Sequence, residues 1–249
     1  MKEVRTIKKI QVKGTIVSND MKWIYEWFDM EATSPRDVME VLDEANGEEV
    51  EVEINSGGGD VFAGSEIYTA LKDYQGTIVT KVVGIAASAA SVIAMAGDRV
   101  LISPTAQIMI HNVWSMARGD YRAMQHEADV LKNYNVTIAN AYKLKSGMDE
   151  KEILKMMDDE TWLNAQQAKE KGFVDEILFD EGNQLVASAS YGFVLPPEVV
   201  NKVRNYIKPQ QQDPVNQNQE PDDDHKQAEL YQARLNFLKL KGGVSHEVD

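Results

Sequence analysis

A strand that leads through three glycines into a helix is the feature of this sequence that most restricts its fold. Residues 50–55, VEVEIN, alternate apolar and polar side chains, as a strand does when one face is buried. Residues 57–59 are all glycine, and we interpret them as a turn. Asp60 can cap a helix that turns Ile67 and Leu71 inward. Strand, turn and helix in this order are typical of an α/β domain.

The same alternation continues on both sides of this unit. Ser34 and Pro35 are a helix N-cap and a first helical residue, and they predict a helix over residues 34–45. Farther along the chain we predict a strand over residues 77–85 and a helix of small residues over 86–97. Two more strands are predicted over residues 99–104 and 107–112. The succession predicts a stack of strand-strand-helix units.

A long helix is predicted over residues 121–144, ended by Gly147. Apolar residues recur along it at intervals of seven: Met124, Leu131 and Ile138. Such a stripe has too few partners within one subunit, so we expect it to pack against another subunit. Asp149 and Asn164 each resemble the start of a further short helix, and residues 173–178 return as a strand.

The composition divides the chain into four parts. A folded domain is expected over residues 1–182, with a C-terminal extension of that domain over 183–208. Residues 209–225 are rich in Pro, Gln, Asn and Asp, which predicts a flexible, disordered linker. Residues 226–241 carry leucines at helical spacing and predict an amphipathic helix.

Charge and residue content exclude several classes of function. The formal net charge of −14 argues against nucleic acid as a partner, because such binding needs Lys and Arg to neutralise phosphates. The chain has no cysteine, so it can have neither a disulfide framework nor a thiol nucleophile. We see no secretory signal and no apolar stretch of about 20 residues, so we expect a cytoplasmic protein that does not enter a membrane.

Three short segments carry the groups that acyl transfer needs. In INSGGGD, residues 54–60, backbone N–H groups can face a ligand without side chains in the way, although a plain glycine turn is an equal reading. In GIAASAAS, Ser88 lies at a helix start, where a hydroxyl can be a nucleophile or only a cap; Ser91 is its rival. In QIMIHN, His111 ends an apolar strand, a place where histidine is more often structural than catalytic. Their conjunction favours a serine hydrolase.

INSGGGDV, GIAASAAS and MIHN resemble the three signature blocks of the ClpP family of serine peptidases, over roughly residues 10 to 180. Gly57 stands where the family usually carries proline, and Ala89 and Ala90 replace its Met-Gly. The resemblance implies Ser88 as nucleophile and His111 as base. It also implies an oxyanion hole of backbone N–H groups, contributed by Gly58, Gly59 and Ala89.

The resemblance places the triad acid in the segment DDETW, residues 158–162. A gap-free match sets Glu160 where the family carries aspartate, and glutamate can also orient an imidazole. Asp159 is the alternative, with Asp158 directly before it. All three could instead be solvated acids ahead of a capped helix.

The resemblance implies an α/β fold of the ClpP/crotonase type, a superhelix whose helix 121–144 is the handle that joins rings. It implies an endopeptidase that needs no metal or organic cofactor. The sequence has no Gly-x-x-x-x-Gly-Lys-Ser/Thr phosphate-binding loop, so we expect the chain itself to act without ATP. Any dependence on ATP would belong to a separate partner. The DETW segment and polar tail resemble phage head maturation proteases, which implies capsid or scaffold substrates and host cytoplasm. The helix over 226–241 would then dock such a partner.

Two other functions remain open. One is an acyl-CoA-processing enzyme of the crotonase type, which shares the fold and stabilises an oxyanion with backbone N–H groups. The other is an inactive ring subunit that only scaffolds an assembly. Ser88 and His111 together argue against both, since neither function requires the pair.

Overall fold

The computed structural model of the protein describes residues 7–180, which belong to one compact unit. The extension, linker and amphipathic helix expected over 183–208, 209–225 and 226–241 lie outside the described residues.

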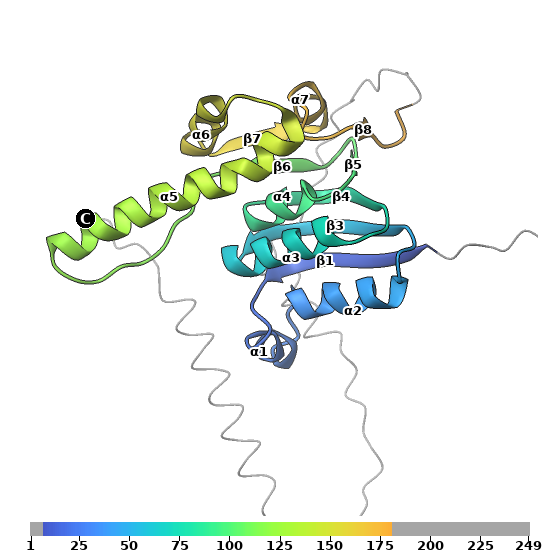
Figure 1. Cartoon of the computed structure of the whole chain (residues 1–249), viewed down its shortest axis with the longest axis horizontal. Helices are drawn as coiled ribbons and strands as arrows, with labels where there is room; N and C mark the ends of the chain where they lie inside the picture. The colour runs from blue at the N-terminus through green and yellow to red at the C-terminus, as the bar shows by residue number, and fades with distance from the viewer. Residues whose placement is uncertain (1–6, 181–249) are drawn as a thin grey trace, which may run out of the picture. The chain divides into compact units, whose positions relative to one another are not determined.

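Eight strands and seven helices alternate along the described chain (Figure 1). The strands are β1 (Lys8–Ile16), β2 (Ala32–Thr33), β3 (Val50–Gly59), β4 (Ile78–Ala87), β5 (Arg99–Ile102), β6 (Gln107–Ile110), β7 (Thr161–Asn164) and β8 (Glu176–Ile177). The helices are α1 (Lys22–Trp27), α2 (Pro35–Ala45), α3 (Val61–Asp73), α4 (Ala89–Ala94), α5 (Tyr121–Ser146), α6 (Glu150–Asp158) and α7 (Ala165–Glu170).

The strands form one sheet in the order β2-β1-β3-β4-β5-β8. Strand β6 leaves this path: it pairs with the last residues of β4, beyond the end of β5, and carries β7 on its other side. The pairings between described strands are parallel except for β6 with β7, which is antiparallel. This is the predicted α/β architecture, in which β5 and β6 pair in succession with β4 and β6 lies beside its carboxyl end.

The core lies between the sheet and helices α2, α3 and α4. Val52 and Ile54 of β3 and Val82 of β4 have no exposed surface, and Ile67 and Leu71 of α3 pack in the same cluster. Each fully buried side chain of this size contributes roughly 1.5–3 kcal/mol to folding. The strand predicted for residues 50–55 and the inward face predicted for the helix after Asp60 are therefore confirmed, but burial does not alternate fully along the strand, because Glu51 is only 8% exposed.

Helix α2 begins where the sequence predicts, at a capping box. The Asp37 carboxylate accepts hydrogen bonds of 2.8 Å from both the backbone N–H and the hydroxyl of Ser34. Lys22 of α1 forms an ion pair with the same carboxylate, so the capping box also joins α1 to α2.

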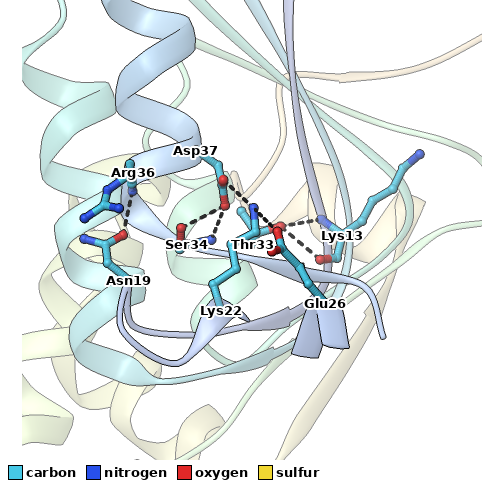
Figure 2. Close-up of polar contacts among 8 residues, drawn as sticks. All are labelled: Lys13, Asn19, Lys22, Glu26, Thr33, Ser34, Arg36 and Asp37. Carbon is cyan, nitrogen blue, oxygen red and sulfur yellow. Dashed lines mark hydrogen bonds and ion pairs between the residues drawn. The ribbon is translucent and has the colours of Figure 1, made fainter. Parts of the chain in front are cut away.

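Figure 2 shows this cluster and two neighbouring contacts. The Arg36 N–H donates a hydrogen bond to Asn19 Oδ1. The Thr33 hydroxyl accepts from the Lys13 N–H and donates to the Lys13 carbonyl.

The three glycines do not form the turn that their sequence suggested. They continue β3, and Gly58 and Gly59 pair with Thr15 and Ile16 of β1. The physical reason is close approach: Gly59 has φ 153°, and a Cβ there would lie 2.1 Å from the Ile16 carbonyl oxygen. Only glycine lets β1 and β3 remain paired at this point.

Helix α5 begins and ends close to the predicted bounds, with Gly147 at its C-cap in the left-handed region at φ 72°. The predicted stripe is divided: Ile138 is 6% exposed and joins the core of its own subunit, whereas Met124 is 38% exposed. The expectation that the whole stripe lacks partners within one subunit is therefore wrong for its C-terminal part. Figure 1 shows the N-terminal part of α5 extending beyond the sheet. Between residues 7 and 180, no helix is long and apolar enough to cross a membrane.

Candidate active site

Ser88 occupies the sharp bend between β4 and α4. Its backbone has φ 54° and ψ −126°, which is rare for a residue with a side chain and costs of order 1–3 kcal/mol. The surroundings hold it there: its N–H donates to the Met109 carbonyl of β6 at 3.0 Å, and its carbonyl accepts from the Ser91 N–H at 2.9 Å. The bend carries the hydroxyl out of the sheet.

His111 follows directly after β6 and meets this hydroxyl. Its Nε2 lies 2.8 Å from Ser88 Oγ, a hydrogen-bond distance, and both side chains are half-buried. The contact follows from the sheet, because β6 runs beside β4 with Met109 opposite Ala87. The structure therefore brings the two residues together across 23 positions of sequence.

The residues after His111 are fixed by two helices. Asn112 donates from Nδ2 to Asp158 Oδ1 at the end of α6, at 2.7 Å. The Val113 N–H donates to Asn135 Oδ1 of α5, at 2.8 Å. Both bonds restrict the backbone that carries the imidazole. Sequence reasoning assigned no role to Asn112, although this residue ends the MIHN block, and it did not identify Asn135.

Of the three residues expected to form an oxyanion hole, two lie beside Ser88. A Cβ on Gly58 would be 2.7 Å from Ser88 Cβ and 3.1 Å from the Ala89 backbone nitrogen, so this glycine lies against the bend. Its own N–H donates to Ser56 Oγ at 3.1 Å. Ala89 is the first residue of α4, a position whose N–H has no acceptor within the helix. Gly59 instead lies against β1.

Glu160 lies across from His111 but does not touch it. In the β6–β7 ladder Ile110 pairs with Thr161, so the antiparallel register sets position 160 opposite position 111. The Glu160 carboxylate is exposed and accepts from Trp162 Nε1 at 3.4 Å. Within residues 7–180, no carboxylate hydrogen bonds to His111.

The two acids before Glu160 lie at the end of α6, outside the β6–β7 ladder. Asp159 is exposed at the C-cap of α6, and Asp158 is the residue that binds Asn112. The structure thus brings Ser88 and His111 together, but none of Asp158, Asp159 and Glu160 hydrogen bonds to His111.

Ser91, the rival nucleophile, is fully buried in α4. Its hydroxyl donates to the Ser88 carbonyl at 2.6 Å and lies 2.8 Å from the Tyr142 hydroxyl of α5. The Ser88 carbonyl and the Tyr142 hydroxyl thus occupy this hydroxyl, and a substrate cannot reach it.

A cleft of about 930 Å³ opens over Ser88 and His111. Its walls come from β1, the glycines of β3, α3, α4, β6 and α5. Two exposed aromatic residues border it: Trp114 is 71% exposed, and Phe62 is 63% exposed and stacks edge-on with Tyr134 at 5.4 Å. Clefts lined by apolar and aromatic side chains with a few polar groups are typical of ligand-binding sites. Among the described residues, no group of three or more His, Asp or Glu could hold a metal ion.

Comparison with known proteins gives a consistent result. The family model described as "Clp protease" matches residues 28–181. Proteolytic subunits of ATP-dependent Clp proteases are similar: that of Deinococcus radiodurans is 28% identical over 141 residues, and one from Bacteroides fragilis is 34% identical over 137 residues. The matches cover 55% and 53% of this chain and 69% and 65% of the two relatives. A mutant of ClpP1 from Listeria monocytogenes has a similar fold, with a TM-score of 0.57 and 22% identity over 70% of this chain and 93% of that one.

Proposed function

Because the chain belongs to the Clp protease family, we propose that it is a serine endopeptidase in which Ser88 is the nucleophile and His111 the general base. The observation that carries the proposal is the 2.8 Å contact between Ser88 Oγ and His111 Nε2 in an open cleft. A hydroxyl is a weak nucleophile until a base within this reach removes its proton.

The reaction proceeds by acyl transfer. Ser88 Oγ forms a bond to the peptide carbonyl carbon while its proton passes to His111 Nε2. The tetrahedral intermediate then breaks its C–N bond, and His111 returns the proton to the departing amine. Water repeats the sequence on the acyl-enzyme and releases the acid product.

The developing oxyanion needs donors beside Ser88, and the N–H groups of Gly58 and Ala89 are the best placed. Ala89 follows the nucleophile directly, and Gly58 lies in contact with the bend. Gly58 must exchange its bond to Ser56 Oγ for the oxyanion or share it between the two. Gly59, which packs on β1, contributes by fixing Gly58 rather than by donating.

Glu160 completes the triad in this proposal. Its position across from His111 in the β6–β7 register supports it over Asp159. Its carboxylate must leave Trp162 Nε1, a long contact of 3.4 Å, to reach the imidazole. Catalytic hydrogen bonds often tighten only in the complex with substrate.

The proposed substrates are polypeptides, and we favour phage capsid or scaffold proteins in the host cytoplasm, cleaved without ATP. The cleft supports an extended chain as substrate, and the polar tail and DETW segment support the phage setting. The helix over 226–241 is proposed to dock the assembly partner. Processing of a candidate scaffold protein by the purified full chain, without ATP, tests this; dependence on ATP and an added ATPase would contradict it.

We further propose that the protein forms a ring. The N-terminal part of α5 extends past the sheet with Met124 and Tyr121 exposed, which supports contact with a second subunit there. Light scattering on the full chain tests this point, and a monomer at micromolar concentration would rule the ring out.

A fluorophosphonate probe tests the chemistry. We expect intact mass to show one adduct on the wild-type chain, and Ser88→Ala to lose both the adduct and hydrolysis of a small ester. Ser65→Ala is the matched control, since Ser65 is a half-buried serine of α3 outside the cleft. A chain that neither labels nor hydrolyses would leave the scaffolding or acyl-CoA functions in place of the peptidase.

A further inference from the structure

The strained peptide of Ser88 is held by a hydrogen-bond chain that reaches it from α5. The Ser88 carbonyl accepts three hydrogen bonds, from Ser91 Oγ at 2.6 Å and from the N–H groups of Ser91 and Val92 at 2.9 and 3.3 Å. A backbone in a sparsely populated region persists only where its surroundings overdetermine it. The shortest of these bonds comes from a side chain, and it is the one that a substitution can remove.

The chain has a defined direction. A serine hydroxyl has one hydrogen, and that of Ser91 is donated to the Ser88 carbonyl, which can only accept. The 2.8 Å contact between Ser91 Oγ and the Tyr142 hydroxyl must therefore take its hydrogen from Tyr142. Tyr142 donates to Ser91, and Ser91 donates to Ser88; donors in series polarise and strengthen one another.

Both side chains are buried, and Tyr142 is also among the residues that line the cleft. Ser91 has no exposed surface and Tyr142 is 1% exposed, with its ring packed against Phe173 at 5.7 Å. Burial raises the pKa of Tyr142 well above its ordinary value, and the bond to Ser91 only partly opposes this. The phenol therefore remains a donor at any pH at which the protein would work.

We propose that Ser91 and Tyr142 are positioning residues that hold the Ser88 peptide in its reactive bend and couple it to the C-terminal part of α5. The inference rests on the proposed function, because it assigns these residues an effect on the reactivity of Ser88. Neither residue touches the reacting atoms. They act through the peptide from which Ser88 Oγ projects toward His111.

The test compares Tyr142→Phe, Ser91→Ala and the double variant in the full chain, with a small ester and a fluorophosphonate. We expect Tyr142→Phe to lower kcat and the phosphonylation rate of Ser88 about tenfold, the effect of one buried hydrogen bond, with KM unchanged. Ser91→Ala removes both hydrogen bonds of the Ser91 hydroxyl, so it should lower kcat and the phosphonylation rate at least as much. The double variant should be no worse than Ser91→Ala, because the hydroxyls act in series.

Tyr74→Phe is the matched control. The Tyr74 hydroxyl also makes two hydrogen bonds, accepting from the Gly47 N–H at 2.9 Å and donating to the Glu48 carbonyl at 2.7 Å, but it lies at the far end of α3 from the cleft. Its loss should lower the melting temperature without changing kcat. Amide hydrogen exchange over residues 84–95 should quicken in Ser91→Ala and stay unchanged in Tyr74→Phe.

Three results would overturn the proposal: kcat of Tyr142→Phe and Ser91→Ala equal to wild type, a rise in KM with kcat unchanged, or an equal loss of kcat in Tyr74→Phe. Unaltered exchange over residues 84–95 in Ser91→Ala would also overturn it, whatever the activity. A wild-type chain that neither labels nor hydrolyses would instead refute the proposed function, so the two failures are distinguishable.

Discussion

Gly58→Ala is the substitution to which this site should be most sensitive. Gly58 has φ 95°, a region that costs a residue with a side chain roughly 1–2 kcal/mol. The added Cβ would lie 2.7 Å from both the Ala87 carbonyl oxygen and Ser88 Cβ, closer than real contacts allow. Overpacking of this kind costs roughly 1–3 kcal/mol more. We therefore expect a total loss of about 2–5 kcal/mol.

The loss should appear in both stability and reactivity. For a domain of this size, that free energy corresponds to a fall in melting temperature of roughly 5–20 °C. The new methyl group also pushes directly on the bend that sets the 2.8 Å distance from Ser88 Oγ to His111 Nε2. A displacement of about 1 Å can lower the rate about 100-fold. Thermal melting and the rate of fluorophosphonate labelling at Ser88 measure the two effects.

Gly57→Ala, one residue earlier, is the control for stability. Nothing lies within 4 Å of a Cβ at Gly57, and its φ is not positive. Alanine there should leave the melting temperature unchanged or raise it slightly, because it restricts the unfolded chain. If Gly58→Ala melts and labels like the wild type, then the close approach of β3 to the Ser88 bend does not constrain the site.

Three further predictions concern Glu160, the Asp37 cap of α2 and the residues after Lys208. Glu160→Gln should lower kcat far more than Asp159→Asn, by up to ~10⁴-fold if the wrong imidazole tautomer is fixed; the opposite order in steady-state rates would place the acid at Asp159. Burial disfavours the Asp37 carboxylate, but its bonds to Lys22 and to the α2 cap outweigh this and lower its pKa below the ordinary 3.8. Its stabilising effect is therefore present above pH 3.8 and is lost as the pH falls through the lowered pKa. Asp37→Asn should have a lower melting temperature than wild type at pH 7, and the difference in melting temperature should become smaller in acid. A difference in melting temperature between Asp37→Asn and wild type that does not change with pH would contradict this. Truncation after Lys208 should leave a soluble chain with normal small-ester turnover; aggregation on size-exclusion chromatography would assign the tail to the folded core.

The sequence predicts those parts of the fold in which local chemistry and burial agree. The Ser-Pro start of α2, the alternation in β3 and the Gly147 end of α5 each have one low-energy solution, and the structure has that solution. Local reading fails where a partner far away in sequence decides the outcome. The glycines of residues 57–59 favour a turn when considered alone, and only the adjacent β1 makes them a strand.

The site shows the same limit. Ser88 and His111 could be identified because each ends a recognisable element. Sequence reasoning favoured Glu160 over Asp159 only through the family resemblance, because it did not identify β7 and so lacked the β6–β7 register, which ends one residue short of His111 and Glu160. It missed Tyr142 for a related reason. Tyr142 follows Ile138 by one helical turn and looks like ordinary core, and only the contact with α4 reveals its hydroxyl as a donor.

The hydrogen bond from the Ser88 N–H to the Met109 carbonyl has a mechanical consequence. Met109 lies on β6, two residues before His111, so this hydrogen bond fastens the proposed nucleophile to the strand that leads to the proposed base. Glu160, the proposed acid, belongs to the connection between α6 and β7, where its N–H donates to the Met157 carbonyl of α6. A shift of α6 would therefore move the proposed acid directly, and it would act on the proposed base through the hydrogen bond from Asn112 to Asp158.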